Sequence, residues 1–154
     1  MADFMAVWAQ SANAYRRYVP KAYVSLAAHW GFNNRTVALR IPRGHGSATR
    51  IEHRVAGADA NPYLLLAAIL GGMLSGLDGE LDPGEETTPS YTPANTARLT
   101  HDFLSAVETF RTSPFIADTF GARYQALYGD TKRKEALAHL RTVSDVDYQT
   151  YLPR

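Results

Sequence analysis

The sequence contains no cysteine, almost no net charge and no long unbroken apolar run, and each absence excludes a class of protein. Without cysteine the chain can form neither a disulfide nor a thiolate metal site, which fits a reducing compartment, so we expect a cytoplasmic protein. Sixteen Lys and Arg residues against fifteen Asp and Glu residues leave a formal charge of +1, so no chain-wide positive field indicates nucleic acid or an anionic membrane as partner. The longest apolar run, residues 63–77, is short for a bilayer and contains three glycines, and the first ten residues lack a signal-peptide pattern. We therefore expect neither export nor a membrane span.

The first third of the chain predicts one short helix followed by a β-hairpin. Phe4, Trp8 and Ala12 lie four residues apart, which predicts a single helix over residues 2–17. Residues 18–30 (YVPKAYVSLAAHW) read as a loop with extended character, whereas residues 35–42 (RTVALRIP) and 49–55 (TRIEHRV) alternate like strands around a glycine-containing turn. Because two strands are too few for a stable sheet, we expect an antiparallel hairpin that contributes to a larger sheet.

The rest of the chain reads as helices. Asn61 is a suitable N-cap with Pro62 at the first helical position, and residues 63–77 are apolar on nearly every side, so we expect a buried helix there. Apolar residues at helical spacing predict another helix that ends at Pro114, namely Leu99, Phe103, Val107 and Phe110. Two further helical stretches are expected over residues 114–130 and 131–152. The fold class is thus α+β in one domain, strand-rich over 18–56 and helical over 61–152.

The charged residues of the hairpin are the candidate site. Arg50, Glu52 and Arg54 lie at every second position, so on a strand all three share one face. Arg35 and Arg40 precede the same turn; they are five residues apart, so one of them has to lie at a strand edge or in a loop. Such a cluster repels itself unless anions fill it, and Arg suits bidentate binding of phosphate or carboxylate.

Two simpler interpretations of this cluster remain open. The charges can form a solvated ion-pair ladder, worth only about 0–1 kcal/mol for each exposed pair. Alternatively, the arginines can bind polyanions, including nucleic acid, without sequence preference or metal, although Glu52 within the cluster disfavours this. An ionised Glu52 beside a phosphate-binding group is also a natural ligand for Mg²⁺ or Mn²⁺, but its co-ligands would lie mostly outside this chain.

Three motifs together resemble the C-terminal part of the catalytic domain in the glutamine synthetase family: NAYRRYVP, NRTVALRIP and RIEHRVAGADANPYLLLAAIL. Within the family they are most similar to γ-glutamylpolyamine (γ-glutamylputrescine) synthetases. The resemblance implies an ATP-dependent ligase that phosphorylates the γ-carboxylate of glutamate or an analogue, after which an amine or ammonia displaces the phosphate. Since residues 21–29 contain no acid where many members have one, ammonia is disfavoured as the amine.

The resemblance also assigns roles to individual residues. Glu52 corresponds to a metal-binding glutamate, and Arg17 and Arg54 to arginines of the glutamate site. Arg35, Arg40 and Arg50 correspond to a wall that binds ATP phosphates, with Arg35 also able to reach the acyl phosphate as a catalytic residue. The intact enzyme is expected to be a homo-oligomer. Because the chain resembles only the last third of a member, we expect it to be inactive alone; the alternative is a catalytically dead remnant that serves as an assembly or interaction module.

Overall fold

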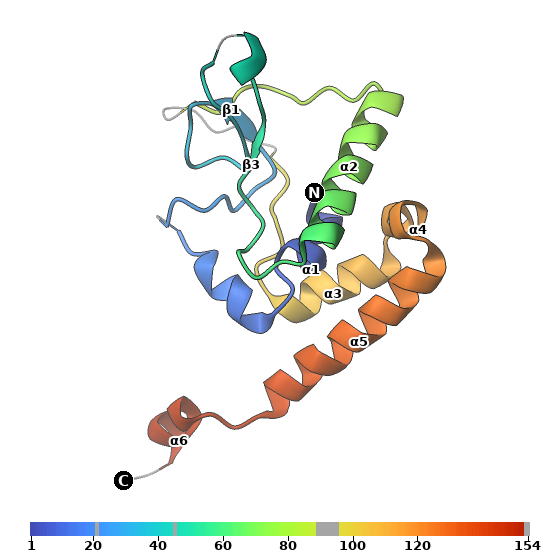
Figure 1. Ribbon diagram of the computed structural model, residues 1–154. Coiled ribbons are helices and arrows are strands. Elements are labelled where there is room, and N and C mark those ends of the chain that lie inside the picture. Colours follow the sequence, from blue (N-terminus) through green and yellow to red (C-terminus); the bar gives the residue numbers. More distant parts are fainter. Residues whose placement is uncertain (21, 45, 89–95, 153–154) are drawn as a thin grey trace.

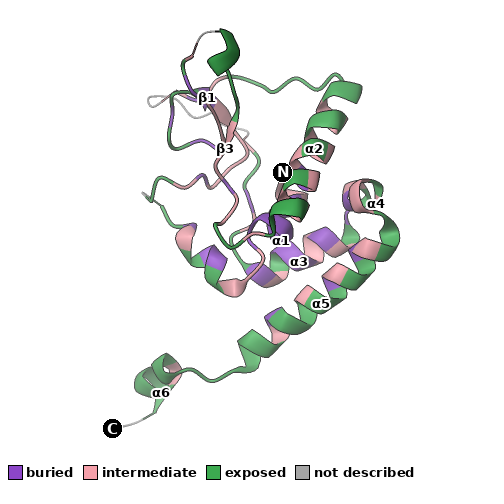
Figure 2. Cartoon of the chain, viewed as in Figure 1, coloured by how far each residue is buried: buried purple, intermediate pink, exposed green. Residues whose placement is uncertain are grey.

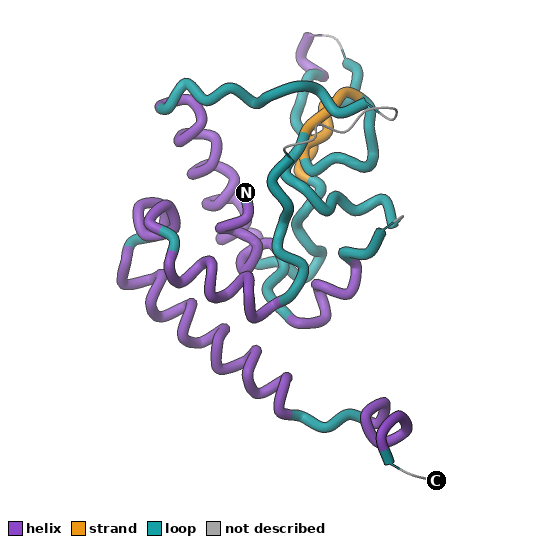
Figure 3. Tube along the Cα trace, turned by 180° about the vertical axis from the view of Figure 1, so that it is seen from behind, coloured by secondary structure: helices purple, strands orange, loops and turns teal. Residues whose placement is uncertain are grey.

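The computed structural model describes residues 1–20, 22–44, 46–88 and 96–152, and it is an α+β structure. Figure 1 shows the strands gathered at one end, helix α2 running beside them, and α3 and α5 packed together below. Helix α6 stands away from the rest at the C-terminal end. Seen from behind, the strands are short and surrounded by long loops (Figure 3).

The sheet has three strands in the order β1-β2-β3: β1 Trp30–Phe32, β2 Leu39–Ile41 and β3 Glu52–His53. The predicted antiparallel pairing of β2 with β3 is confirmed, with Arg40 opposite Glu52. Both strands are shorter than predicted, and β1, which pairs parallel to β2, was not predicted as a strand. Strand β2 is shorter than the predicted 35–42 because the Asn34 side chain accepts hydrogen bonds from the Thr36 backbone and hydroxyl groups, which favours a turn over extended chain.

The N-terminal segment is not the single helix that was predicted. It consists of a 3₁₀ turn at Ala2–Phe4, the helix α1 at Met5–Trp8 and a 3₁₀ helix at Ala12–Arg17. The break occurs because the Ser11 side chain accepts a hydrogen bond from the Ala14 N–H and so starts a new helical segment. All four residues of α1 are buried, and Figure 2 shows the buried residues concentrated where α1 meets α3.

Helix α2 spans Pro62–Asp78 and begins as predicted, because the Asn61 side chain accepts hydrogen bonds from the N–H groups of the next two non-proline residues. The expectation that it is buried was wrong. Among its residues only Ala68 is buried, and most of its large apolar side chains are about half exposed or more. Its main contacts with other elements are with α1 and α4. Apolar composition alone thus did not reveal whether the helix has a partner.

The remaining helices are α3 Phe103–Thr112, α4 Pro114–Phe120, α5 Ala122–Arg141 and α6 Asp145–Tyr151. The predicted end at Pro114 is confirmed. The boundary predicted at residue 130 is wrong, because the chain breaks instead at Gly121, which has φ of +84°, and before Ser144, which caps α6. Gly129 stays inside α5, where the absence of a Cβ lets the Arg111 side chain approach closely.

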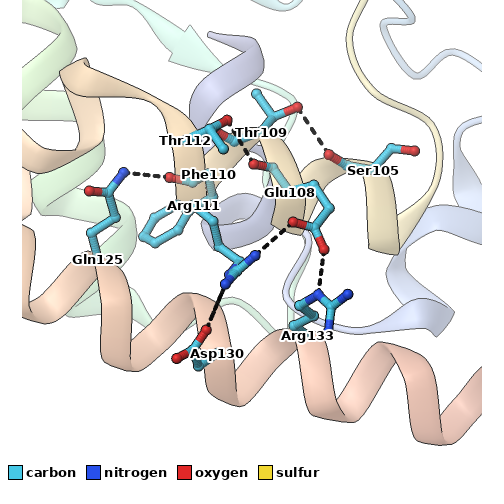
Figure 4. A network of polar contacts seen from close by, with 9 residues as sticks. All are labelled: Ser105, Glu108, Thr109, Phe110, Arg111, Thr112, Gln125, Asp130 and Arg133. Carbon is cyan, nitrogen blue, oxygen red and sulfur yellow. Dashed lines mark hydrogen bonds and ion pairs between the residues drawn. The ribbon is translucent and has the colours of Figure 1, made fainter.

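Helices α3 and α5 are joined by polar contacts as well as by the core (Figure 4). The buried Gln125 amide donates to the carbonyls of Phe110 and Ser113, both at 2.8 Å. Nearer the surface, Arg111 and Glu108 of α3 form ion pairs with residues of α5. Within the described residues, no helix is both long enough and apolar enough to cross a lipid bilayer.

Candidate functional site

Five side chains from separate segments surround a pocket of about 550 Å³ beside the sheet: Tyr23, Arg35, Arg40, Glu52 and Arg54. Arg40 comes from β2 and Glu52 from β3, directly opposite each other in the antiparallel register. Arg54 follows β3, Arg35 lies in the turn before β2, and Tyr23 comes from the preceding loop. The structure therefore brings together four of the six residues proposed from the sequence.

Glu52 pairs with two arginines at once. Its Oε2 atom accepts from Arg40 Nη1 at 2.8 Å, and its Oε1 atom accepts from Arg54 Nη1. The hydrogen bond from Arg54 and then the one from Arg40 hold the pKa of the Glu52 carboxyl below its usual range, against an opposing effect of desolvation. Glu52 is therefore ionised at neutral pH. All three side chains are partly accessible, with exposed fractions of 21% for Arg40, 22% for Arg54 and 34% for Glu52.

Arg35 reaches the same pocket because it lies in a turn rather than on the strand. The buried Asn34 side chain fixes this turn: its amide donates to the Thr87 carbonyl at 3.0 Å, and its oxygen accepts from Thr36. The five-residue separation from Arg40, which would place the two on opposite faces of a continuous strand, is thereby resolved. Arg35 is exposed, and in the described part of the chain it forms no ion pair.

The loop that carries Tyr23 is connected to the sheet through Arg54. The Nη2 atom of Arg54 lies 3.4 Å from the Tyr23 carbonyl, to which it donates. Tyr23 has φ of +53°, a left-handed conformation that side chains other than Asn, Asp and Gly rarely adopt, and it is 70% exposed. Sequence reasoning missed this residue, because no local pattern indicates a left-handed tyrosine.

Arg17 lies next to the pocket but does not line it. Its guanidinium donates to the backbone carbonyls of Val55 and Arg54, the latter at 3.4 Å, and lies 5.0 Å from the centre of the Tyr18 ring. Arg17 therefore holds the backbone just beyond β3, at Arg54 and at the residue that follows it. It thus contacts the backbone that carries Arg54 rather than the pocket itself.

Arg50 departs from the expected geometry. Because β3 begins only at Glu52, the alternation does not extend back to Arg50, whose Nη1 atom donates to the Ala48 carbonyl at 3.2 Å. Arg50 is exposed and lies outside the pocket lining. The prediction that all three charges share one face holds only for Glu52 and Arg54.

The pocket offers one carboxylate to a metal ion. Among the described residues, no group of three or more His, Asp or Glu side chains is placed to hold a metal. Hard divalent cations take six or more oxygen ligands, so Glu52 fits as one ligand of such an ion but cannot form the site alone. That the co-ligands come from outside this chain stays a prediction.

Comparison with known proteins decides the family. Residues 1–151 match the family described as glutamine synthetase, catalytic domain. The chain belongs to the glutamine synthetase family. It is 40% identical to the γ-glutamylputrescine synthetase of Escherichia coli K12, covering 99% of this chain and 32% of that enzyme. It is 32% identical to the γ-glutamylethanolamide synthetase of Streptomyces coelicolor, over 93% of this chain and 31% of the relative.

The fold is shared with solved members of the family. The ligand-free structure of GmaS superimposes with a TM-score of 0.82 at 27% identity, covering 99% of this chain and 35% of that one. The relatives are ligases, which confirms the predicted enzyme class of the family. The chain spans about a third of the length of the curated relatives it matches.

Proposed function

We propose that this chain is the part of an ATP-dependent carboxylate–amine ligase that binds phosphate and the substrate carboxylate. The ligase would form a γ-glutamyl amide through an acyl-phosphate intermediate. The observation that carries the proposal is the pocket in which Arg35, Arg40 and Arg54 surround Glu52. Three guanidiniums around one carboxylate leave an excess positive charge, which suits a site for anionic groups.

The proposed roles follow from position. Arg35 and Arg40 would bind ATP phosphates, and Arg35, whose guanidinium forms no ion pair among the described residues, would also reach the acyl phosphate. Arg54 would bind the substrate carboxylate, and Arg17, held against the backbone of residues 54 and 55, would support it from the adjacent position. Arg50 remains a candidate for phosphate binding only if its side chain leaves the Ala48 carbonyl.

Glu52 is the proposed ligand for Mg²⁺ or Mn²⁺. Such an ion, when bound, would neutralise charge that develops on the phosphoryl oxygens. The contribution of this chain is to keep Glu52 ionised, through its two arginine partners, and to place it within the same pocket as the phosphate-binding groups. The remaining ligands would come from the other two thirds of a family member.

For the amine we propose an alkylamine or polyamine rather than ammonia. The relative with 40% identity is a γ-glutamylputrescine synthetase, and the second is a γ-glutamylethanolamide synthetase. Residues 21–29 carry no carboxylate to deprotonate an ammonium ion, which supports the same choice.

Calorimetric titration with a non-hydrolysable ATP analogue, with and without Mn²⁺, tests this proposal. We expect binding that requires Mn²⁺, that is lost in Glu52→Ala and that is retained in Glu135→Ala. Glu135 is a matched control because its carboxylate pairs with Lys132 on α5, away from the pocket. A folded chain that binds no analogue, or that binds it equally in Glu52→Ala, would contradict the proposal.

One observation favours a second candidate, an assembly module without catalytic chemistry. Helix α2 leaves a row of apolar side chains exposed, including Leu66, Leu70 and Leu74 at 49–59%. Contiguous exposed apolar patches often mark surfaces that bind another protein. Self-association of the chain without any affinity for nucleotide would support this candidate over the ligase site.

A further inference from the structure

Asn33 occupies the point where the chain leaves β1 and turns towards β2. Its φ is +50°, in the left-handed region, and its N–H donates to the Ile41 carbonyl at 3.0 Å. This bond connects the end of β1 to the end of β2. Asn33 is not among the residues that line the pocket, but Arg40, which does line it, lies one residue before Ile41.

The amide oxygen of Asn33 accepts two hydrogen bonds. The backbone N–H of Arg43 donates to it at 3.1 Å, and the Nη2 atom of Arg40 donates at 3.4 Å. Because a backbone N–H can bond only to an acceptor, the Arg43 contact fixes which end of the amide faces inward. The oxygen is therefore held where the Arg40 guanidinium meets it.

We propose that Asn33 is a positioning residue for Arg40. The Arg40 guanidinium is planar and is bound at two of its nitrogens, Nη1 by Glu52 at 2.8 Å and Nη2 by Asn33. Two anchors on a planar group fix its orientation as well as its position, whereas Glu52 alone would leave it free to rotate about one contact. The consequence for phosphate binding rests on the proposed function.

A role limited to the backbone turn does not account for these contacts. Glycine satisfies a left-handed φ without steric cost, and asparagine is the side chain that also tolerates it. Asparagine at this position adds an acceptor, and that acceptor bonds an arginine of the pocket. The side chain thus joins the turn to the pocket.

The variant Asn33→Gly tests the proposal, because it keeps the backbone conformation and removes only the acceptor. In the 154-residue variant without ligand, we expect NMR to show hydrogen exchange at the Arg40 guanidinium that is about threefold to tenfold faster than in the wild type. This factor corresponds to the loss of one net hydrogen bond. Arg54 is the internal control: it pairs with the same Glu52 but does not touch Asn33. In Asn33→Asp, which retains the acceptor, Arg40 should keep its protection.

Unchanged exchange at Arg40 in Asn33→Gly would overturn the proposal, and so would an equal loss of protection at Arg54, which would indicate general loosening. A second measurement concerns function: Asn33→Gly should bind the ATP analogue about threefold to tenfold more weakly than the wild type. If the wild type binds no analogue, the proposed function fails, whereas the exchange measurement still decides whether Asn33 holds Arg40.

Discussion

Gly31 is the position where one added methyl group should damage both the sheet and the site. It lies in β1 opposite Arg40, and the backbone of Thr87 passes so close that a Cβ at Gly31 would lie 2.4 Å from the Thr87 carbonyl oxygen. Real Cβ atoms essentially never approach below 3.0 Å, and a backbone oxygen cannot rotate away. The variant Gly31→Ala must therefore displace the Thr87 segment from the sheet.

The cost follows from the bonds that this displacement breaks. The Thr87 N–H donates to the Trp30 carbonyl at 2.9 Å, and the Thr87 carbonyl accepts from Asn34 at 3.0 Å. Thr87 and Asn34 are both buried, so groups that lose their partners stay away from water, which costs about 1–3 kcal/mol each. We expect Gly31→Ala to lower the free energy of unfolding by about 2–4 kcal/mol.

The same substitution at Gly76 is the matched control. In α2 a Cβ at Gly76 would meet nothing within 4 Å, so Gly76→Ala should stabilise the chain by about 0.5–1 kcal/mol through helix propensity. Urea unfolding followed by circular dichroism measures both effects. Because Asn34 also fixes the Arg35 turn, Gly31→Ala should weaken binding of the ATP analogue, and Gly76→Ala should not. A Gly31→Ala variant as stable as the wild type would refute the reasoning.

Two further predictions concern the contact between α3 and α5 (Figure 4). Gln125→Leu removes the donor to two buried backbone carbonyls, so it should lower the free energy of unfolding, measured with urea, by about 2–4 kcal/mol. The control Gln149→Leu changes an exposed residue and should alter this free energy by less than about 0.5 kcal/mol. Equal effects of the two substitutions would contradict the prediction. Hydrogen bonds from Arg133 and then Arg111 hold the pKa of Glu108 below its usual value, so the stabilisation exists at neutral pH and is lost as the pH falls below that usual value and through the lowered pKa of the folded chain. Because Glu108 is 40% exposed, Glu108→Gln should lower the unfolding free energy by less than about 1 kcal/mol at pH 7, and this loss should shrink as the pH falls through the lowered pKa of Glu108; a loss that does not change with pH would contradict the assignment.

The parts of the fold that the sequence predicted are those set by local interactions. The start of α2 follows from Asn61 and Pro62, and the boundary after α3 from Pro114, because capping and proline effects act within a few residues. Strand β1 escaped prediction because three residues, Trp-Gly-Phe, carry no periodicity, and they form a strand only by pairing with β2. The exposure of α2 was mispredicted for a related reason: an apolar helix does not itself specify what covers it.

The residues of the site likewise fall into those that local sequence pattern placed correctly and those that it did not. Glu52 and Arg54 were placed together correctly because they are two residues apart at the end of β3, and Arg50 was misplaced because the strand is shorter than its alternating pattern. Tyr23 and Asn33 could not be recognised, since both depend on left-handed backbone conformations that only the folded chain reveals. The functional roles of all these residues remain predictions that the titrations above are designed to test.

The pairing of Glu52 with two arginines also explains why the nucleotide titration has to be run both with and without the divalent metal. Both carboxylate oxygens already accept hydrogen bonds from guanidiniums, so a divalent cation that binds there competes with the arginines for the same carboxylate. An anion that draws Arg40 or Arg54 to itself removes this competition and adds attraction for the cation. Under the proposed function, metal and phosphate therefore bind this pocket cooperatively. Because linkage is reciprocal, the metal should strengthen nucleotide binding by the same factor by which nucleotide strengthens metal binding.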